Sequence, residues 1–194
     1  FEPATEPGYI RAWPAAGQEI DFWLLGSSQF GAMLAAELGL PYAFASHFAP
    51  ALLEDAADTY RSTFRASKWL DAPYFMMAAG LCAAETDAEA EYLRSSQVLA
   101  FARLRTGRPG KLPAPTHDLS EIPPQVRTEV EASLGCSATG SQATVKAQLR
   151  ELLNRYRPDE LIVTGMIHDH SARLRSFEIA AGVLGELRQE RVGG

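Results

Sequence analysis

The sequence predicts an α/β protein in which short apolar strands alternate with helices. Three observations indicate this: apolar runs of strand length recur along the chain, helix-favouring segments follow them, and turn residues separate the two. Strand followed by helix occurs four times, which predicts about four parallel strands with right-handed crossovers. A small doubly wound sheet and half of an eightfold barrel both fit this order, and spacing alone does not distinguish them.

The composition is that of one globular domain over residues 1–194, with 46% apolar and 22% charged residues. The net charge of −6 and the lack of a basic run argue against nucleic-acid binding. No apolar run approaches the ~18 residues of a membrane helix, and no signal-peptide pattern opens the chain. We therefore expect a cytoplasmic protein that binds neither nucleic acid nor membrane.

The first strand, turn and helix occupy residues 22–39, after a lead-in or hairpin around Tyr9–Trp13. An apolar strand at 22–25 runs into the tight turn 26–28, and a helix covers 29–38. Such a junction offers unpaired N–H groups, the positive end of a helix dipole and two serine hydroxyls, which together suit a phosphate. From the residues alone, simple capping of the helix by a serine is the favoured explanation.

The middle of the chain continues the alternation. Residues 42–46 predict a second strand, and Pro50 suits the first turn of a helix that ends near Phe64. A continuous apolar run at 74–84 predicts a strand that is buried on both faces.

The C-terminal part predicts a helix over 86–104, with capping-box spacing at its start. Residues 106–124 are rich in proline and predict an irregular loop of the kind that often forms a lid or binding loop. A helix from 140 to about 156, a strand at 160–164 and a last helix over 171–188 follow.

Histidines and cysteines offer few catalytic candidates. His47 follows the second strand directly, at the end of the sheet where barrel enzymes carry their chemistry, so it is a candidate catalytic residue. The alternative is that its ring only holds the loop. In His168-Asp169-His170 adjacent positions rarely converge on one ion, so we expect no metal site and expect Asp169 to cap the last helix. Cys82 and Cys136 are isolated, and we expect both to be buried thiols.

Two segments carry a resemblance to a known family. They are LLGSSQFGAMLAAELGLPYAFASHFAP at 24–50 and DELIVTGMIHDHSARLRSFEIAA at 159–181, supported by a Gly-Ser-x-x-Thr-Val helix start at 140–145. In this order they resemble the C-terminal half of the bacterial luciferase-like flavin monooxygenases. The resemblance implies the C-terminal half of a TIM-type (β/α)8 barrel that binds FMN at the C-terminal ends of its strands.

The resemblance also implies a site for the flavin phosphate. The family binds it in the turn after the fifth barrel strand, which corresponds here to Gly26, Ser27 and Ser28. This reverses the preference for simple capping, because anion chemistry and family context now agree. Gln29 and Phe30, at the same helix start, are further candidates for cofactor binding.

The implied function is that of an FMN-dependent monooxygenase or oxidoreductase acting on a small organic substrate. Reduced flavin or a flavin reductase would be its partner, and a deazaflavin is the second candidate for the cofactor. About four strands of the family's barrel would precede residue 1, so we expect a fragment of a longer protein, or a chain that completes a barrel as a homo-oligomer or with an N-terminal half. A catalytically incomplete fragment or structural half-barrel is the alternative function.

Overall fold

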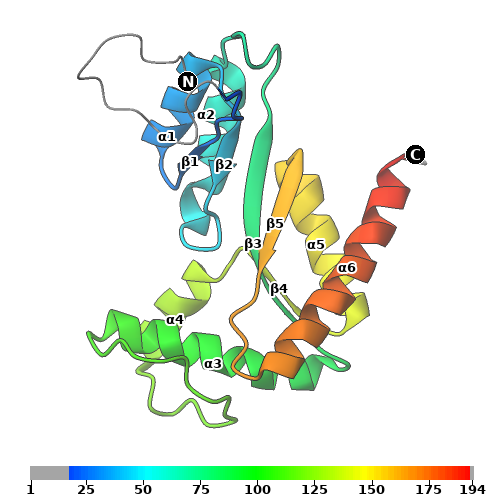
Figure 1. Ribbon diagram of the computed structural model, residues 1–194. Helices are drawn as coiled ribbons and strands as arrows, with labels where there is room; N and C mark the ends of the chain where they lie inside the picture. The colour runs from blue at the N-terminus through cyan, green and yellow to red at the C-terminus, as the bar shows by residue number, and fades with distance from the viewer. Residues whose placement is uncertain (1–17, 193–194) are drawn as a thin grey trace.

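The computed structural model describes residues 18–192, which form an open parallel sheet flanked by helices (Figure 1). The expected lead-in around Tyr9–Trp13 lies outside these residues. Within the described part the elements are β1 (Leu24–Gly26), α1 (Gln29–Leu38), β2 (Tyr42–Phe44), the 3-10 helix η1 (Pro50–Leu52), α2 (Leu53–Thr63), β3 (Phe75–Ala83), α3 (Asp87–Arg105), α4 (Pro124–Ser133), β4 (Ser137–Gly140), α5 (Gln142–Tyr156), β5 (Glu160–Thr164) and α6 (His170–Val192).

The long strand β3 is the centre of the sheet. β2 pairs with its residues 75–77 and β5 with its residues 76–80, so these two strands lie on opposite edges of β3. β1 pairs with β2 in turn, and every pairing is parallel. The order β1, β2, β3, β5 follows the chain without the reversal that marks a doubly wound sheet, and this favours the barrel alternative.

The short strand β4 follows β2 along the same edge of β3, and Ser46 fills the gap between them. Ala78 N donates to the Ser46 Oγ at 3.0 Å, and the Ser46 hydroxyl donates to the Ala78 carbonyl. Two residues further on, Gly80 N donates to the Cys136 carbonyl at 2.9 Å. The second strand was predicted to reach residue 46; its backbone pairing stops at Phe44, and the buried Ser46 side chain continues the ladder.

One face of the sheet is covered by both helix pairs. The odd-numbered residues of β3 contact α1 and α2 through Phe75 and Met77, and contact α5 and α6 through Leu81 and Ala83. The opposite face is exposed on the outer strands, where Leu25 is 72% and Ile162 is 48% exposed, whereas Ala78 and Cys82 of β3 are buried. A parallel sheet normally buries both faces, so this half-covered sheet has the geometry of part of a barrel whose interior is open.

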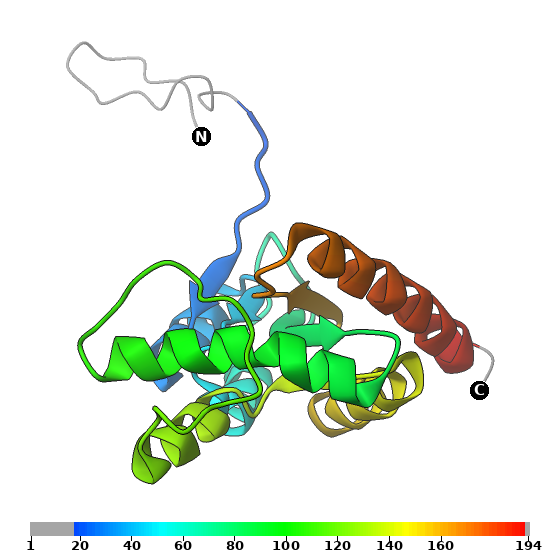
Figure 2. The same cartoon turned by 90° about the horizontal axis from the view of Figure 1, so that it is seen from below.

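A long excursion separates β3 from α5. It contains α3, an irregular stretch, α4 and β4, and it lies across the C-terminal end of the sheet (Figures 1 and 2). α3 was predicted, but α4 and β4 were not, so the described residues contain five strands instead of about four. The reason is that Ser137–Gly140 has no apolar run, and its strand conformation depends on pairing with the end of β3.

Helix ends follow their local signals. Gly39 closes α1 in the left-handed conformation, with φ of 62°. Thr86 Oγ1 accepts from Glu89 N at 3.2 Å at the start of α3, and Asp169 Oδ1 accepts from Ala172 N at 2.7 Å at the start of α6. Both predicted N-caps are confirmed. Among residues 18–192, no helix combines the length and the hydropathy needed to cross a bilayer.

Candidate functional site

The turn Gly26–Ser28 lies at the C-terminal end of β1, directly before α1. Ser28 is the N-cap residue, with extended backbone (φ −149°, ψ 167°), but its side chain makes no capping hydrogen bond. Ser27 and Ser28 are both exposed, and the first turn of α1 contains no acidic residue. The serines therefore do not cap the helix with their side chains, and the positive end of α1 is accessible to an anion.

The glycines of this turn have a packing role as well. A Cβ on Gly26 would lie 3.3 Å from the Tyr42 Oη, and one on Gly31 would lie 3.4 Å from the same oxygen. The Tyr42 hydroxyl itself donates to the Ser28 carbonyl at 3.2 Å. The missing side chain of Gly26 makes room for the Tyr42 ring beneath the turn, and its contact with a cofactor stays a prediction.

Gln29 and Phe30 begin α1 and differ in their surroundings. Gln29 is half-buried, whereas Phe30 is 68% exposed and lies on the outer surface of the helix with Met33 and Leu38, which are also exposed. At both positions it is the backbone N–H at the start of the helix that suits an anion.

A second glycine–serine helix start, at Gly140–Thr144, is already filled. Asp87 Oδ1 accepts from Ser141 N at 2.6 Å, and the hydrogen bonds from Ser141 and Thr144 hold the pKa of this carboxyl below its usual value. Gly140 has φ of 144°, and a Cβ there would lie 2.7 Å from Asp87 Oδ1. The Asp87 carboxylate thus occupies the start of α5. Of these two helix starts, only that of α1 is open to an anion from outside the chain.

His47 lies just beyond the C-terminal end of β2, next to the buried Ser46. Its Nδ1 is buried without a hydrogen-bond partner among residues 18–192, and its ring contacts that of Phe48 with the centroids 4.0 Å apart. Burial lowers the pKa of the His47 ring and so favours its neutral form. This strand-end position agrees with the prediction from the sequence, while a catalytic role stays a prediction.

Two of the other histidines contact local groups. His170 Nδ1 lies 2.7 Å from Arg173 Nη2, and the exposed His117 stacks on Tyr92 with centroids 4.5 Å apart. Within the described part of the chain, no three His, Cys, Asp or Glu side chains come close enough to hold a metal ion.

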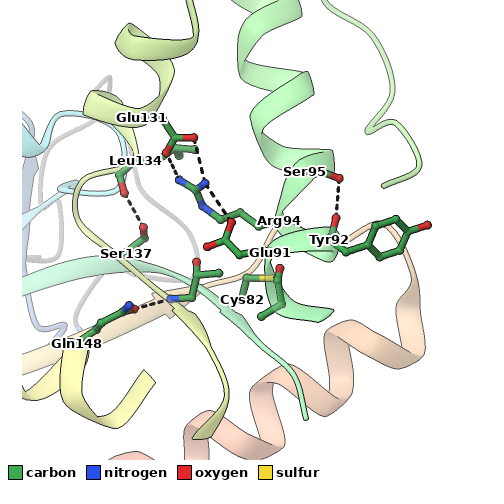
Figure 3. Close-up of polar contacts among 11 residues, drawn as sticks. Cys82, Glu91, Tyr92, Arg94, Ser95, Glu131, Leu134, Ser137 and Gln148 are labelled. Carbon is green, nitrogen blue, oxygen red and sulfur yellow. Dashed lines mark hydrogen bonds and ion pairs between the residues drawn. The ribbon is translucent and has the colours of Figure 1, made fainter. Parts of the chain in front are cut away.

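Within the excursion, an ion pair that the sequence did not predict joins α4 to α3. Arg94, whose side chain is only 13% exposed, donates to both carboxylate oxygens of Glu131, at 3.2 and 2.5 Å, and lies 3.9 Å from Glu91 (Figure 3). Nearby, burial raises the pKa of the Cys82 thiol to about 12. Arg94 therefore fixes α4 on α3 at the C-terminal end of β3, and Cys82 is a buried thiol, as predicted.

The irregular stretch between α3 and α4 is also bound to α3. Thr116 N donates to Ser95 Oγ at 2.8 Å, and Arg103 pairs with Glu121 at 3.1 Å. A cavity of about 370 Å³ between the stretch and α3 is lined by residues that include Leu99, Arg103 and Asp118. The excursion is thus a packed layer at the C-terminal end of β3.

Comparison with known proteins identifies the family. The sequence model described as luciferase-like monooxygenase matches residues 4–158. The chain belongs to this family. The family and the α/β half-barrel architecture predicted from the sequence are both confirmed.

Individual relatives agree with this family assignment. The chain is 43% identical over 188 residues to a luciferase-like monooxygenase of Escherichia coli K12, covering 96% of this chain and 56% of that protein. It is 40% identical over 175 residues to the Bacillus subtilis protein YvbT, covering 90% of this chain and 52% of YvbT. The crystal structure of apo-MsnO8 superposes with a TM-score of 0.72 at 29% identity, over 91% of this chain and 54% of MsnO8.

This luciferase-like chain spans about half the length of the curated relatives it matches. A structure called flavoprotein 390 has the same fold, with a TM-score of 0.55 at 12% identity, over 88% of this chain and 68% of its own. The open sheet face is consistent with a half-length match, because a complete barrel would bury that face.

Proposed function

We propose that this chain is the phosphate-binding half of a luciferase-like oxidoreductase whose cofactor is FMN. The observation that carries the proposal is the uncapped start of α1 at the C-terminal end of β1, in a chain whose other glycine–serine helix start is filled by Asp87. Two exposed hydroxyls, unpaired N–H groups and a helix dipole suit the FMN phosphate. A deazaflavin is the second candidate, and it too would place an anion at this turn.

Each candidate residue would have a defined task. The hydroxyls of Ser27 and Ser28 would donate to phosphate oxygens, together with the backbone N–H groups of Gln29 and Phe30. Bound flavin would supply the redox chemistry, passing electrons to dioxygen or hydride to an acceptor. The protein would hold the flavin and orient a small organic substrate.

His47 is the candidate for hydrogen bonding to that substrate or to the flavin ring. Its Nδ1 is buried without a partner among the described residues, and a buried N–H without an acceptor is costly, so we place the ring proton on Nε2. His47 would then act as a neutral donor at the end of β2, one strand away from the phosphate turn.

The alternative is a chain that does not catalyse on its own. Leu25 and Ile162 are exposed on the face that a barrel would enclose, and β1 and β5 each leave one edge unpaired among residues 18–192. We propose that an N-terminal half-barrel, or a second copy of the chain, covers this face. Analytical ultracentrifugation distinguishes the two, because only self-association doubles the mass of the purified chain.

Flavin titration tests the phosphate site. In the variant Ser27→Ala/Ser28→Ala, each lost hydrogen bond to a charged group is worth about 1.5–3 kcal/mol, so we expect FMN affinity to fall about 100-fold or more. The matched control is Ser62→Ala/Thr63→Ala, which removes two exposed hydroxyls that bond only within α2. Equal FMN affinity in both double variants would reject the phosphate site, and a purified chain without flavin binding would favour the non-catalytic alternative.

A further inference from the structure

The Tyr42 hydroxyl lies directly beneath the turn proposed to bind the phosphate. We propose that Tyr42 is a positioning residue, which aims the N–H groups at the start of α1 toward the bound phosphate without touching the ligand. This inference rests on the proposed function, because it assigns a role to a residue behind that site.

The Tyr42 hydroxyl holds the peptide unit between Ser28 and Gln29. The Ser28 carbonyl accepts from the Tyr42 hydroxyl at 3.2 Å and from Ala32 N at 3.4 Å. Because a trans peptide is planar, its C=O and N–H point in opposite directions. A Ser28 carbonyl held toward Tyr42 therefore directs the Gln29 N–H away from the core, on the side where the turn is exposed.

Two glycines leave the space that lets the Tyr42 hydroxyl reach this carbonyl. A Cβ on Gly31 would lie 3.3 Å from the Gly26 Cα and 3.4 Å from the Tyr42 Oη. These distances are at the short end of ordinary contacts, so a side chain at either glycine would press on the Tyr42 ring or on the backbone where β1 meets α1. The two glycines and the hydroxyl form one unit.

Tyr42 is itself held firmly in the core. Its side chain is fully buried, and its ring packs against Tyr60 and Phe75 with centroids 5.4 and 6.0 Å away. Burial raises the pKa of the Tyr42 hydroxyl to about 12, so it stays a hydrogen-bond donor at neutral pH. A hydroxyl fixed in this way holds the Ser28 peptide in one orientation before the ligand arrives, which reduces the cost of binding.

Tyr60 provides a matched control. It is equally buried, and near the N-terminal ends of β2 and β3 its hydroxyl donates to the Leu40 carbonyl at 2.9 Å and accepts from Tyr74 N at 3.0 Å. Tyr60→Phe therefore removes a comparable buried hydroxyl without altering the start of α1.

The experiment compares the affinities of the wild type, Tyr42→Phe and Tyr60→Phe for FMN and for riboflavin, which lacks the phosphate, by flavin fluorescence. We expect the wild type to bind FMN more tightly than riboflavin. Tyr42→Phe should reduce this preference about fivefold to tenfold, which is the effect of losing one hydrogen bond, and should leave the riboflavin affinity unchanged. Tyr60→Phe should keep the wild-type preference. A general folding defect would instead lower both affinities together.

The outcomes separate the inference from the proposed function. If the wild type prefers FMN and Tyr42→Phe retains that preference, or loses affinity for both flavins equally, the positioning role of Tyr42 is wrong while the phosphate site stands. If the wild type shows no preference for FMN, the phosphate site is wrong and the inference falls with it.

Discussion

The carboxylate of Asp87 accepts a hydrogen bond of 2.6 Å from the backbone N–H of Ser141. This contact joins the first residue of α3 to the N-cap residue of α5, across the whole excursion that separates them. It closes the excursion at its two ends, and it gives the dipole of α5 a negative partner from within the chain.

The variant Asp87→Asn should destabilise the fold in a pH-dependent way. Hydrogen bonds hold the folded-state pKa of Asp87 below its usual 3.8, so the carboxylate contributes stability that is fully present above this value and is lost as the pH falls through the folded-state pKa. We expect wild type and variant to differ in their free energy of unfolding at neutral pH and to converge in strong acid. Urea unfolding across this pH range measures the difference.

The control for this prediction is Asp71→Asn, in an exposed loop outside the helix ends. It should leave the free energy of unfolding close to that of the wild type at every pH. If Asp87→Asn behaves like Asp71→Asn at neutral pH, Asp87 does not stabilise the start of α5.

A second prediction concerns the ion pair between Arg94 and Glu131. Glu131→Ala leaves a guanidinium that is only 13% exposed without its bidentate partner, so we expect a loss of about 1–3 kcal/mol in the free energy of unfolding. Chemical denaturation followed by circular dichroism measures this loss. Limited proteolysis should at the same time cleave the excursion faster, because α4 is then less tightly bound to α3.

Glu129→Ala is the control on the same helix. Glu129 pairs with Arg105 at 3.6 Å, its own side chain is 65% exposed, and such surface pairs contribute less than about 1 kcal/mol. Equal losses in the two variants would show that α4 is held by its apolar contacts and not by Arg94.

The sequence predicted those parts of the fold whose signals are local. The apolar run of β3 and the caps of α3 and α6 each depend on neighbouring residues, and all were predicted from the sequence. β4 was missed because its four small and polar residues become a strand only by pairing with the end of β3. Its conformation is a tertiary effect that no short pattern contains.

In the candidate site, too, the local features could be predicted from the sequence and the long-range contacts could not. The turn at Gly26–Ser28 could be located from the helix start and the family resemblance. The contacts that distinguish this turn from the start of α5 could not be predicted, because they join residues far apart in the sequence. Asp87 and Ser141 are 54 positions apart, and Tyr42 and Ser28 are 14 apart. A tyrosine in an apolar strand indicates only a core position, and its hydroxyl acquires a partner only when the helix folds back over the strand.

The last prediction compares two helical glycines. Gly182 lies in α6 with nothing within 4 Å of a Cβ, so Gly182→Ala should raise the free energy of unfolding by about 0.5–1 kcal/mol through helix propensity alone. Gly31→Ala gains the same propensity in α1, but its methyl group would press on Tyr42 and on the Gly26 backbone, at 3.4 and 3.3 Å. We therefore expect Gly31→Ala to be less stable than Gly182→Ala by about 1–3 kcal/mol, the cost of overpacking. Thermal unfolding of both variants checks this, and equal stabilisation would mean that the contact between β1, α1 and Tyr42 is looser than described above.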